Sequence, residues 1–239
     1  MRIFLAGASG AIGRRLVPLL VQAGHQVTGM TRSAASAAEL QRAGAIPAVV
    51  DVFDAPALTS AMAAAKPNVV IHQLTDLPRE FDPAKIAASY TANSRIRTEG
   101  TRNLITAAQA AGATRLIVQS IAFAYAPGGE PHVESDPLNL DDPARAVTVR
   151  GAADMERQAL EAAGIAAVVL RYGLLYGPGT WSDGPSRKPA LHVDAAAHAA
   201  LLALTRGEAG VYNIADDDGA VLIVKARAEL SFDPDFRLR

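Results

Sequence analysis

The sequence feature that most constrains the fold is the glycine-rich stretch GASGAIG at residues 7–13. An apolar run precedes it and predicts a strand, and an amphipathic pattern at residues 12–23 predicts a helix directly after it. In that order the first N–H groups of the helix lie free at the end of a strand, and together with the helix dipole they can hold a pyrophosphate. The stretch therefore predicts a dinucleotide-binding turn.

The three glycines of this stretch have separate expected roles. Gly7 permits the tight turn, Gly10 lets a phosphate approach the backbone, and Gly13 lets the helix pack closely on the strand. A second predicted strand at residues 26–30 completes a βαβ unit at the required distance. The alternative is a glycine turn without a ligand. We expect the cofactor to contact Gly7, Ser9, Gly10, Ala11, Ile12 and Gly13.

Length and composition limit the class of protein. The chain has 239 residues, about half of them apolar, and a net charge of −1. This length suits one α/β core with a small additional lobe, and the near-neutral charge with scattered arginines argues against nucleic-acid binding. Cysteine is absent, which excludes disulfides and thiolate chemistry. We expect no membrane contact and a cytoplasmic location, because no apolar run reaches the roughly 20 residues of a membrane helix.

Short β-branched runs alternate with alanine-rich helical patterns along the chain. This alternation is typical of a parallel sheet with helices on both faces, so together with the glycine turn it predicts an α/β fold of the Rossmann type with a doubly wound parallel sheet. The next expected strands cover residues 46–50, 68–71 and 115–119, and the expected helices cover residues 35–43, 83–111 and 144–163. On the second of these helices a solvated or interface face is expected for Arg95, Arg97 and Arg102.

The end of the second strand carries Thr31, Arg32 and Ser33. An NAD-specific site usually has Asp or Glu here for the adenosine ribose, whereas a basic residue accommodates the 2′-phosphate of NADP. Arg32 with Ser33 therefore favours NADP over NAD as the cofactor. The alternative is a solvated arginine at a strand end.

Further polar residues follow strands whose carboxyl ends meet at one edge of a parallel sheet, where ligands bind. Asp51 is expected to bond the adenine amino group, with Val52 covering the ring. The alternative is that Asp51 or Asp54 caps the helix that starts near residue 55. The fourth strand brings three more expected cofactor contacts to this edge: His72, Gln73 and Leu74.

Several motifs along nearly the whole chain together resemble the extended or atypical short-chain dehydrogenase/reductase superfamily, in its NAD-dependent epimerase/dehydratase group. The motifs are GASGAIG at 7–13, Asp51-Val52, the strand end at His72, EGTRNL at 99–104, Gln119-Ser120, RYGLLYGPG at 171–179, His192-Val193-Asp194 and VYNI at 211–214. The resemblance implies a Rossmann-type fold, a nicotinamide cofactor, and further cofactor contacts at Gln119, Tyr172 and Gly173. Because relatives commonly pair through the helices expected at 83–111 and 144–163, it also implies a homodimer.

The chain departs from this superfamily at the catalytic pair, a Tyr followed four residues later by a Lys that lowers the pKa of the phenol. None of the five tyrosines has a Lys at that spacing, and the two positions fall near Thr148 and Ala152. The catalytic Ser or Thr of the superfamily falls at Ser120 or Ile121, and Ser120 is the better candidate. The remaining candidates for proton transfer are Tyr125 and either Tyr172 or Tyr176. For each tyrosine the alternative is packing, with the hydroxyl at the surface.

The C-terminal third of the chain has two more features. His192, Asp194 and His198 are spaced as in a metal site, but the resemblance places Asp194 at a helix N-terminus, and we expect no metal. The links at residues 180–191 and 218–225 are shorter than the substrate-covering segments of relatives. We therefore expect a dinucleotide-binding domain at residues 1–170 and a reduced substrate lobe at 171–239, interleaved with the last elements of the sheet.

These features predict an NAD(P)-dependent oxidoreductase that acts on a small carbonyl or alcohol substrate. Ser120 would orient the substrate oxygen, and a tyrosine or water would handle the proton. The absent Tyr/Lys pair also suits a second hypothesis, a cofactor-binding module or redox sensor without turnover. A nucleotide-sugar epimerase or dehydratase is the third hypothesis, and it would need both the pair and a larger lobe.

Overall fold

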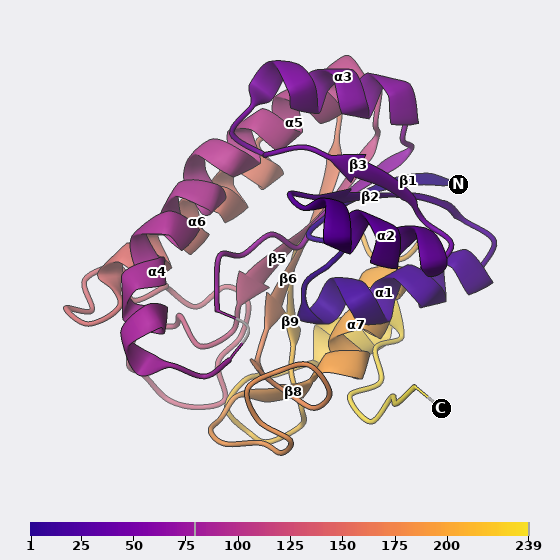
Figure 1. Cartoon of the computed structure of the whole chain (residues 1–239). Coiled ribbons are helices and arrows are strands. Elements are labelled where there is room, and N and C mark those ends of the chain that lie inside the picture. The colour runs from indigo at the N-terminus through magenta and orange to yellow at the C-terminus, as the bar shows by residue number, and fades with distance from the viewer. Residues whose placement is uncertain (79, 239) are drawn as a thin grey trace.

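The computed structural model describes residues 1–78 and 80–238. Its centre is a seven-stranded sheet in which all neighbouring strands are parallel (Figure 1). In spatial order the strands are β3 (Ile46–Val49), β2 (Gln26–Thr31), β1 (Arg2–Ala6), β4 (Val69–His72), β5 (Arg115–Ile121), β6 (Ala166–Tyr172) and β9 (Gly210–Ile214). The predicted α/β fold with a Rossmann-type parallel sheet is confirmed, with strand ends one or two residues from those predicted.

The strand order reverses between β1 and β4. The chain builds β1, β2 and β3 outward in one direction and then returns to place β4 on the other side of β1. In doubly wound sheets ligands bind in the crevice at this reversal, beyond the carboxyl ends of the strands. The glycine turn lies there, because residue 7 directly follows β1.

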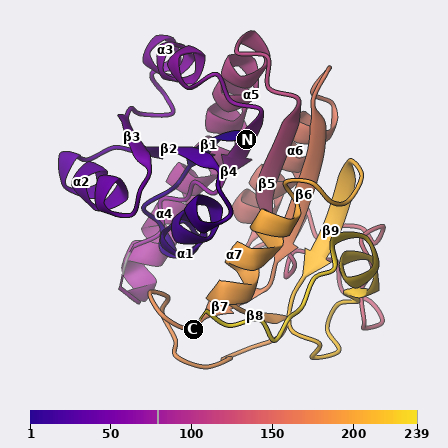
Figure 2. The same cartoon turned by 90° about the vertical axis from the view of Figure 1, so that its right-hand side faces the viewer.

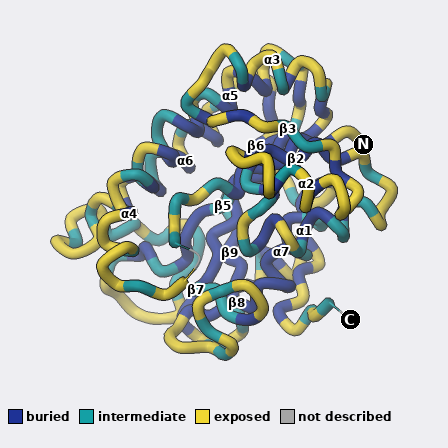
Figure 3. The backbone as a smooth tube through the Cα atoms, viewed as in Figure 1, coloured by how far each residue is buried: buried dark blue, intermediate teal, exposed yellow. Residues whose placement is uncertain are grey.

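Helices cover both faces of the sheet (Figures 1 and 2). On one face α1 (Ala11–Gln22) packs against α7 (Val193–Leu202), and α2 (Ala34–Arg42) lies along β2 and β3. On the other face α3 (Ala55–Ala65) packs against α5 (Thr101–Ala110), and α4 (Pro83–Arg95) packs against α6 (Ala146–Leu160). The helices and the sheet enclose two apolar cores, which form the dark-blue interior of Figure 3. Leu16 in one core and Leu58 in the other are fully enclosed, and each such burial stabilises the fold by about 1.5–3 kcal/mol.

The helix predicted at residues 83–111 contains a π-helical turn, η1 (Ile96–Gly100), between α4 and α5. A π-turn holds one more residue than an α-turn, so it changes which side chains face the sheet. Arg97 in this turn is only 9% exposed, and the prediction of a solvated face is wrong for it. Arg95 and Arg102 are exposed, as predicted, and Arg95 pairs with Glu99 at 2.7 Å.

After β6 the chain forms a small second sheet from β7 (Leu174–Tyr176) and β8 (Ala190–His192), followed by α7, β9 and the π-turn η2 (Ala226–Leu230). The segment after residue 170 therefore supplies this small sheet and also the last strand of the main one. The domain boundary at residue 170 stays a prediction. Within residues 1–78 and 80–238, no helix is both long enough and apolar enough to cross a membrane.

Candidate functional site

The carboxyl ends of the parallel strands bring the predicted site residues to one edge of the sheet. Ala6 of β1 is in register with Met30 of β2 and His72 of β4, and Ile121 of β5 is in register with Tyr172 of β6. The segments that follow these positions are therefore neighbours. After β1, β2 and β4 these are the glycine turn, Thr31 to Ser33, and Gln73 with Leu74. The last residues of β5 and β6 lie farther along the edge and include Gln119, Ser120 and Tyr172, with Gly173 after them.

The backbone of the glycine turn requires Gly7 and Gly13. Gly7 has a φ of +89°, and a Cβ on it would lie 2.4 Å from the carbonyl oxygen of Gln73. A Cβ on Gly13 would lie 2.2 Å from the Gly7 carbonyl oxygen. Gly10 differs, because a Cβ there would meet only the same oxygen, at 3.4 Å. The fold thus needs two of the glycines, and the third leaves open space beside the turn.

Helix α1 begins with free backbone donors. Its N-cap is Gly10, no described side chain caps it, and its first turn contains no acidic residue. The Arg14 N–H donates to the Gly10 carbonyl, which leaves the N–H groups of Ala11, Ile12 and Gly13 without helical partners. Free donors at the positive end of a helix dipole fit the diphosphate of a dinucleotide.

Arg32 lies at the end of β2, where the cofactor's adenosine is expected. Its guanidinium pairs with Asp76 at 2.9 Å, and its side chain is 61% exposed. Ser33 caps α2 by accepting from the Ser36 N–H, and Thr31 is buried at the end of β2. Because an exposed ion pair contributes little stability, Arg32 is free to exchange Asp76 for another anion.

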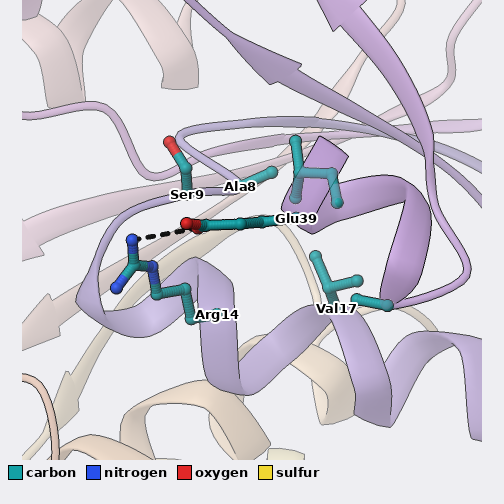
Figure 4. A pocket seen from close by; sticks show the side chains of 7 residues that line it. Ala8, Ser9, Arg14, Val17 and Glu39 are labelled. Atoms are coloured by element: carbon teal, nitrogen blue, oxygen red, sulfur yellow. Dashed lines mark hydrogen bonds and ion pairs between the residues drawn. The ribbon is translucent and has the colours of Figure 1, made fainter. Parts of the chain in front are cut away.

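A cavity of about 60 Å³ lies beside the glycine turn (Figure 4). Arg14 of α1 and Glu39 of α2 form an ion pair of 3.2 Å at its edge, close to Ser9. Sequence reasoning missed Arg14, although its place directly after Gly13 was a signal for it. The turn therefore has a second cation nearby whose partner is an exposed carboxylate.

Asp51 and Asp54 each accept a hydrogen bond from a backbone N–H two or three residues later in the chain. Asp54 caps α3 by accepting from the Ala57 N–H, and Asp51 accepts from the Phe53 N–H. The capping alternative is thus confirmed for Asp54. Val52 is buried in the core that includes α3 and α5. The contacts of Asp51 and Val52 with adenine stay predictions.

His72 ends β4 as an enclosed, neutral ring. Its Nδ1 accepts from the Leu74 N–H, so Nε2 carries the proton and donates to the Thr101 hydroxyl at 3.1 Å. Burial, together with the nearby charge of Arg97, lowers the pKa of His72 to about 3. Since both ring nitrogens are hydrogen-bonded, His72 cannot act as a base toward a substrate. It links the end of β4 to Thr101 of α5.

Gln73 and Tyr172 form a buried polar pair at the same edge. The Gln73 amide nitrogen donates to the Tyr172 hydroxyl at 3.1 Å, and burial raises the pKa of Tyr172. Gln73 Oε1 is enclosed and has no hydrogen-bond partner among the described residues. An enclosed acceptor without a donor costs free energy, so this atom fits a donor that a bound ligand supplies.

Two further predicted contacts flank this pair. The Gln119 amide donates to the Leu74 carbonyl at 3.1 Å, which ties the end of β5 to the segment after β4. Gly173 lies against β8, and a Cβ on it would be 2.6 Å from the Ala190 carbonyl oxygen. These positions fix the backbone along the edge.

Ser120 is bonded to a buried ion pair. Its Oγ donates to Glu156 Oε1 at 2.5 Å, and Arg171 donates to the two oxygens of that carboxylate at 2.9 and 2.7 Å. All three side chains are buried, and this two-pronged geometry is the strong form of an Arg–carboxylate pair. Because Glu156 engages the Ser120 proton, the Ser120 oxygen can only accept a hydrogen bond from a ligand.

Tyr125 extends the same network. Its hydroxyl accepts from Arg171 at 2.9 Å and donates to Asn213 at 2.6 Å, and burial raises the pKa of Tyr125. The packing alternative for Tyr125 and Tyr172 expected hydroxyls at the surface, but both residues are buried and their hydroxyls bond inside the protein. Tyr176 is half-buried, and its hydroxyl accepts from Arg237 at 3.2 Å.

The two positions near which the resemblance places the missing Tyr/Lys pair, Thr148 and Ala152, lie on α6. Thr148 is half-buried, and its carbonyl oxygen accepts from Arg97 at 2.9 Å. Ala152 is enclosed in a small apolar cluster. Sequence reasoning missed the buried charges of Arg97, Glu156 and Arg171, since charged residues on a helix usually face solvent. For Arg171 the signal was its place inside an apolar strand.

His192, Asp194 and His198, the three residues spaced as in a metal site, make different contacts. His192 caps α7 by accepting from the Asp194 N–H, and Asp194 pairs with Arg15 at 2.6 Å. Although burial acts in the opposite direction, the hydrogen bond from Arg15 lowers the pKa of Asp194. His198 stacks on Phe236. Asp194 thus lies in the first turn of a helix, as predicted, and the described residues contain no group of three metal-ligating side chains.

Comparison with known proteins finds an NAD(P)H-binding family and similar reductases. A model described as NAD(P)H-binding matches residues 7–194. A 3-diazoavenalumate denitrifying reductase from Streptomyces sp is 42% identical over 92% of this chain and 77% of that protein. A 2-alkyl-3-oxoalkanoate reductase from Stenotrophomonas maltophilia (strain K279a) is 29% identical over 75% of this chain, which spans about half of that protein, 52%.

A solved structure gives the same picture of the fold. The UDP-glucose 4-epimerase of Thermotoga maritima, determined with UDP-glucose, superposes with a TM-score of 0.80 over 99% of this chain and 94% of that chain. The two sequences are 18% identical. At this identity the likeness shows the shared fold alone.

Proposed function

The chain belongs to the NAD(P)H-binding family and is an NAD(P)-dependent reductase of the atypical short-chain dehydrogenase/reductase type, and from this premise we propose that it reduces a substrate that takes no proton from the protein. The free N–H groups of α1, the space beside Gly10 and the unpartnered Gln73 acceptor fit the dinucleotide. When bound, the dinucleotide supplies a hydride. The residues at the ends of β4, β5 and β6 then bind and orient the substrate.

One observation carries this proposal: the candidate proton donors Ser120, Tyr125 and Tyr172 are either bonded to a buried partner or less acidic than a free phenol. The Ser120 proton bonds to Glu156, and burial raises the pKa of both Tyr125 and Tyr172. The resemblance places the lysine that would lower a phenol's pKa near Ala152, which is enclosed. Reduction of a carbonyl needs a proton near neutral pH, so a substrate that needs none fits this site better.

A diazo compound is a substrate class that meets this condition. The relative with 42% identity is named for denitrifying a diazo compound. For a substrate in its diazonium form, a C–H bond forms with the hydride, the C–N bond breaks, dinitrogen leaves with the electrons of that bond, and the nicotinamide is oxidised. The charges balance without a proton. The protein then has only to bind the substrate, orient it and exclude water.

A small ketone or alcohol is the second candidate substrate, and the name of the oxoalkanoate reductase favours it. In this case Ser120 accepts a hydrogen bond from the alcohol, because its own proton is engaged by Glu156. Water rather than a side chain carries the proton. A redox sensor is the remaining alternative, and it predicts cofactor binding without turnover.

The proposal is tested by NADPH oxidation with a stable arene diazonium salt and, separately, with a panel of aldehydes and ketones. We expect protein-dependent oxidation with the diazonium salt, release of dinitrogen, and deuterium in the arene when the nicotinamide of NADPH is deuterated. Gly10→Ala, which keeps the fold but blocks the turn, gives the background rate. Turnover of the carbonyl panel alone would favour the second candidate, and binding without any turnover would favour a sensor.

We also propose that NADP is preferred over NAD through Arg32. A charge-assisted hydrogen bond contributes about 1.5–3 kcal/mol, so Arg32→Ala is expected to weaken NADPH binding about tenfold or more and to leave NADH binding nearly unchanged. Calorimetric titration at one ionic strength measures both affinities. Arg42→Ala, which removes another exposed arginine, is the control. Equal affinities of the unmodified protein for NADPH and NADH would contradict this preference.

A further inference from the structure

Arg97 is a buried cation without a carboxylate partner. It lies in η1, and within the described part of the chain it forms one hydrogen bond, to the Thr148 carbonyl oxygen at 2.9 Å. It makes no ion pair with any described residue, whereas the other buried guanidinium, that of Arg171, is paired with Glu156. Burial lowers the pKa of Arg97 to about 10, so the side chain keeps its charge at neutral pH.

The buried carboxylate on this side of the sheet does not compensate that charge. Glu156 acts on Arg97 electrostatically, but Arg171 already bonds both of its oxygens and Ser120 bonds one of them. The buried ionisable groups here are thus two guanidiniums, one carboxylate, the neutral ring of His72 and the protonated phenols of Tyr125 and Tyr172. The half-buried Glu134 carboxylate accepts from the Asn213 N–H. One positive charge is in excess, although buried charges in proteins are normally paired.

The guanidinium of Arg97 borders accessible space. Among the described residues, the fully enclosed polar atoms without a partner are Gln73 Oε1, His198 Nδ1 and Asp216 Oδ1. Arg97 is 9% exposed and none of its nitrogens belongs to this set, so the two nitrogens without a described bond keep some accessible surface. The group lies against α6, because it bonds the Thr148 carbonyl oxygen. Its turn η1 leads directly into Thr101, which is bonded to His72 at the end of β4.

We propose that Arg97 binds an anionic oxygen of the substrate, of the carboxylate class, and that this anion compensates the excess buried charge. The inference rests on the proposed function in taking this edge as the substrate site. A guanidinium presents parallel N–H donors that match the two oxygens of a carboxylate. Arg97 holds the substrate away from its reacting atom and so determines which substrates bind.

The test compares benzoate with benzamide, which has nearly the same shape but no charge, as ligands of the NADPH-loaded protein. Calorimetry is expected to show benzoate binding about tenfold or more tighter than benzamide, the ratio that one or two charge-assisted hydrogen bonds give. Arg97→Met and Arg97→Gln are expected to bind the two ligands equally. Arg97→Gln keeps a donor for the Thr148 carbonyl, which protects the fold. Arg102→Met, on the exposed side of the same helical stretch, is expected to keep the preference.

Two results would overturn the inference: equal binding of benzoate and benzamide by the unmodified protein, or an unchanged preference in the folded Arg97 variants. NADPH affinity, measured first in each sample, separates this outcome from a failure of the proposed function. If the protein binds NADPH but does not distinguish the two ligands, the result contradicts the role of Arg97 and leaves the proposed function intact. If the protein does not bind NADPH, the result contradicts the proposed function itself, and with it the inference that rests on it.

Discussion

Burial sets the charge of His72, and this makes the stability of the protein depend on pH. In the folded state its pKa is lowered from 6.5 to about 3. Between these values the unfolded chain binds a proton that the folded chain does not bind. Protonation therefore favours the unfolded state, and the free energy of unfolding falls as the pH decreases from 6.5 toward 3.

The expected contribution of His72 to this decrease is about 1.4 kcal/mol per pH unit. His72→Asn removes the titrating group, so the stability difference between the unmodified protein and this variant should shrink by about 2 kcal/mol from pH 7 to pH 5. Urea denaturation at both pH values measures it. His25→Asn, at a partly exposed position, is the comparison: partial burial lowers the pKa of His25 too, so its difference should change in the same direction by a smaller amount. A difference that stays constant with pH would show that His72 is protonated equally in both states.

The buried network of Ser120, Glu156 and Arg171 could not be predicted from the sequence pattern, which does not show the hydrogen-bond partners of a side chain. The motif Gln119-Ser120 and the resemblance directed attention to Ser120, but its hydrogen bond to Glu156 depends on a helix that begins 26 residues later in the chain, at Ala146. Removing one partner of a buried pair typically costs about 3–5 kcal/mol. Such partners are set by tertiary packing, so the sequence predicted that Ser120 lies at the edge and missed what holds it there.

In the turn before α1, the fold requires one glycine and the ligand requires another. A side chain at position 13 collides with the backbone of residue 7, while a side chain at position 10 meets a single oxygen at 3.4 Å. Gly13 is therefore required by packing. Gly10 is required only if something occupies the space next to it.

This difference predicts that two similar substitutions both weaken NADPH binding but that only one of them lowers the stability. Gly13→Ala is expected to lower the free energy of unfolding by about 1–3 kcal/mol, as overpacking does, and to lose NADPH binding. Gly10→Ala is expected to keep the stability within about 0.5 kcal/mol and to weaken NADPH binding at least about tenfold. Urea denaturation and calorimetry measure the two quantities. Gly184→Ala, with open space around the new methyl group, is the control. NADPH affinity that survives Gly10→Ala would place the diphosphate elsewhere.

Helices and strands followed the sequence pattern closely where the pattern was local. Apolar β-branched runs and alanine-rich amphipathic segments gave the sheet and its covering helices, and the superfamily resemblance drawn from the motifs is confirmed. The π-turn η1 could not be predicted, because the same residues suit an α-helix by propensity. Its consequence, the burial of Arg97, therefore appeared only in the structure.

In the whole molecule, the paired helices α4 and α6 present apolar side chains to solvent. Tyr90 of α4 and Val147 and Leu160 of α6 are among the exposed large apolar residues. The resemblance had already suggested these two helices as a pairing surface. A two-fold dimer would bring each patch onto its own copy, since the same surface is used on both subunits.

We therefore expect a homodimer whose mass is twice 24.9 kDa, and we expect Val147→Glu to make it a monomer. The carboxylate would be buried near its symmetry mate, where desolvation and like-charge repulsion both oppose association. Size-exclusion chromatography with light scattering measures the mass. Ile46→Glu changes an equally exposed residue on β3, at the far edge of the sheet, and should leave the dimer intact. A monomeric unmodified protein, or a dimer that Val147→Glu does not weaken, would remove α4 and α6 as the interface.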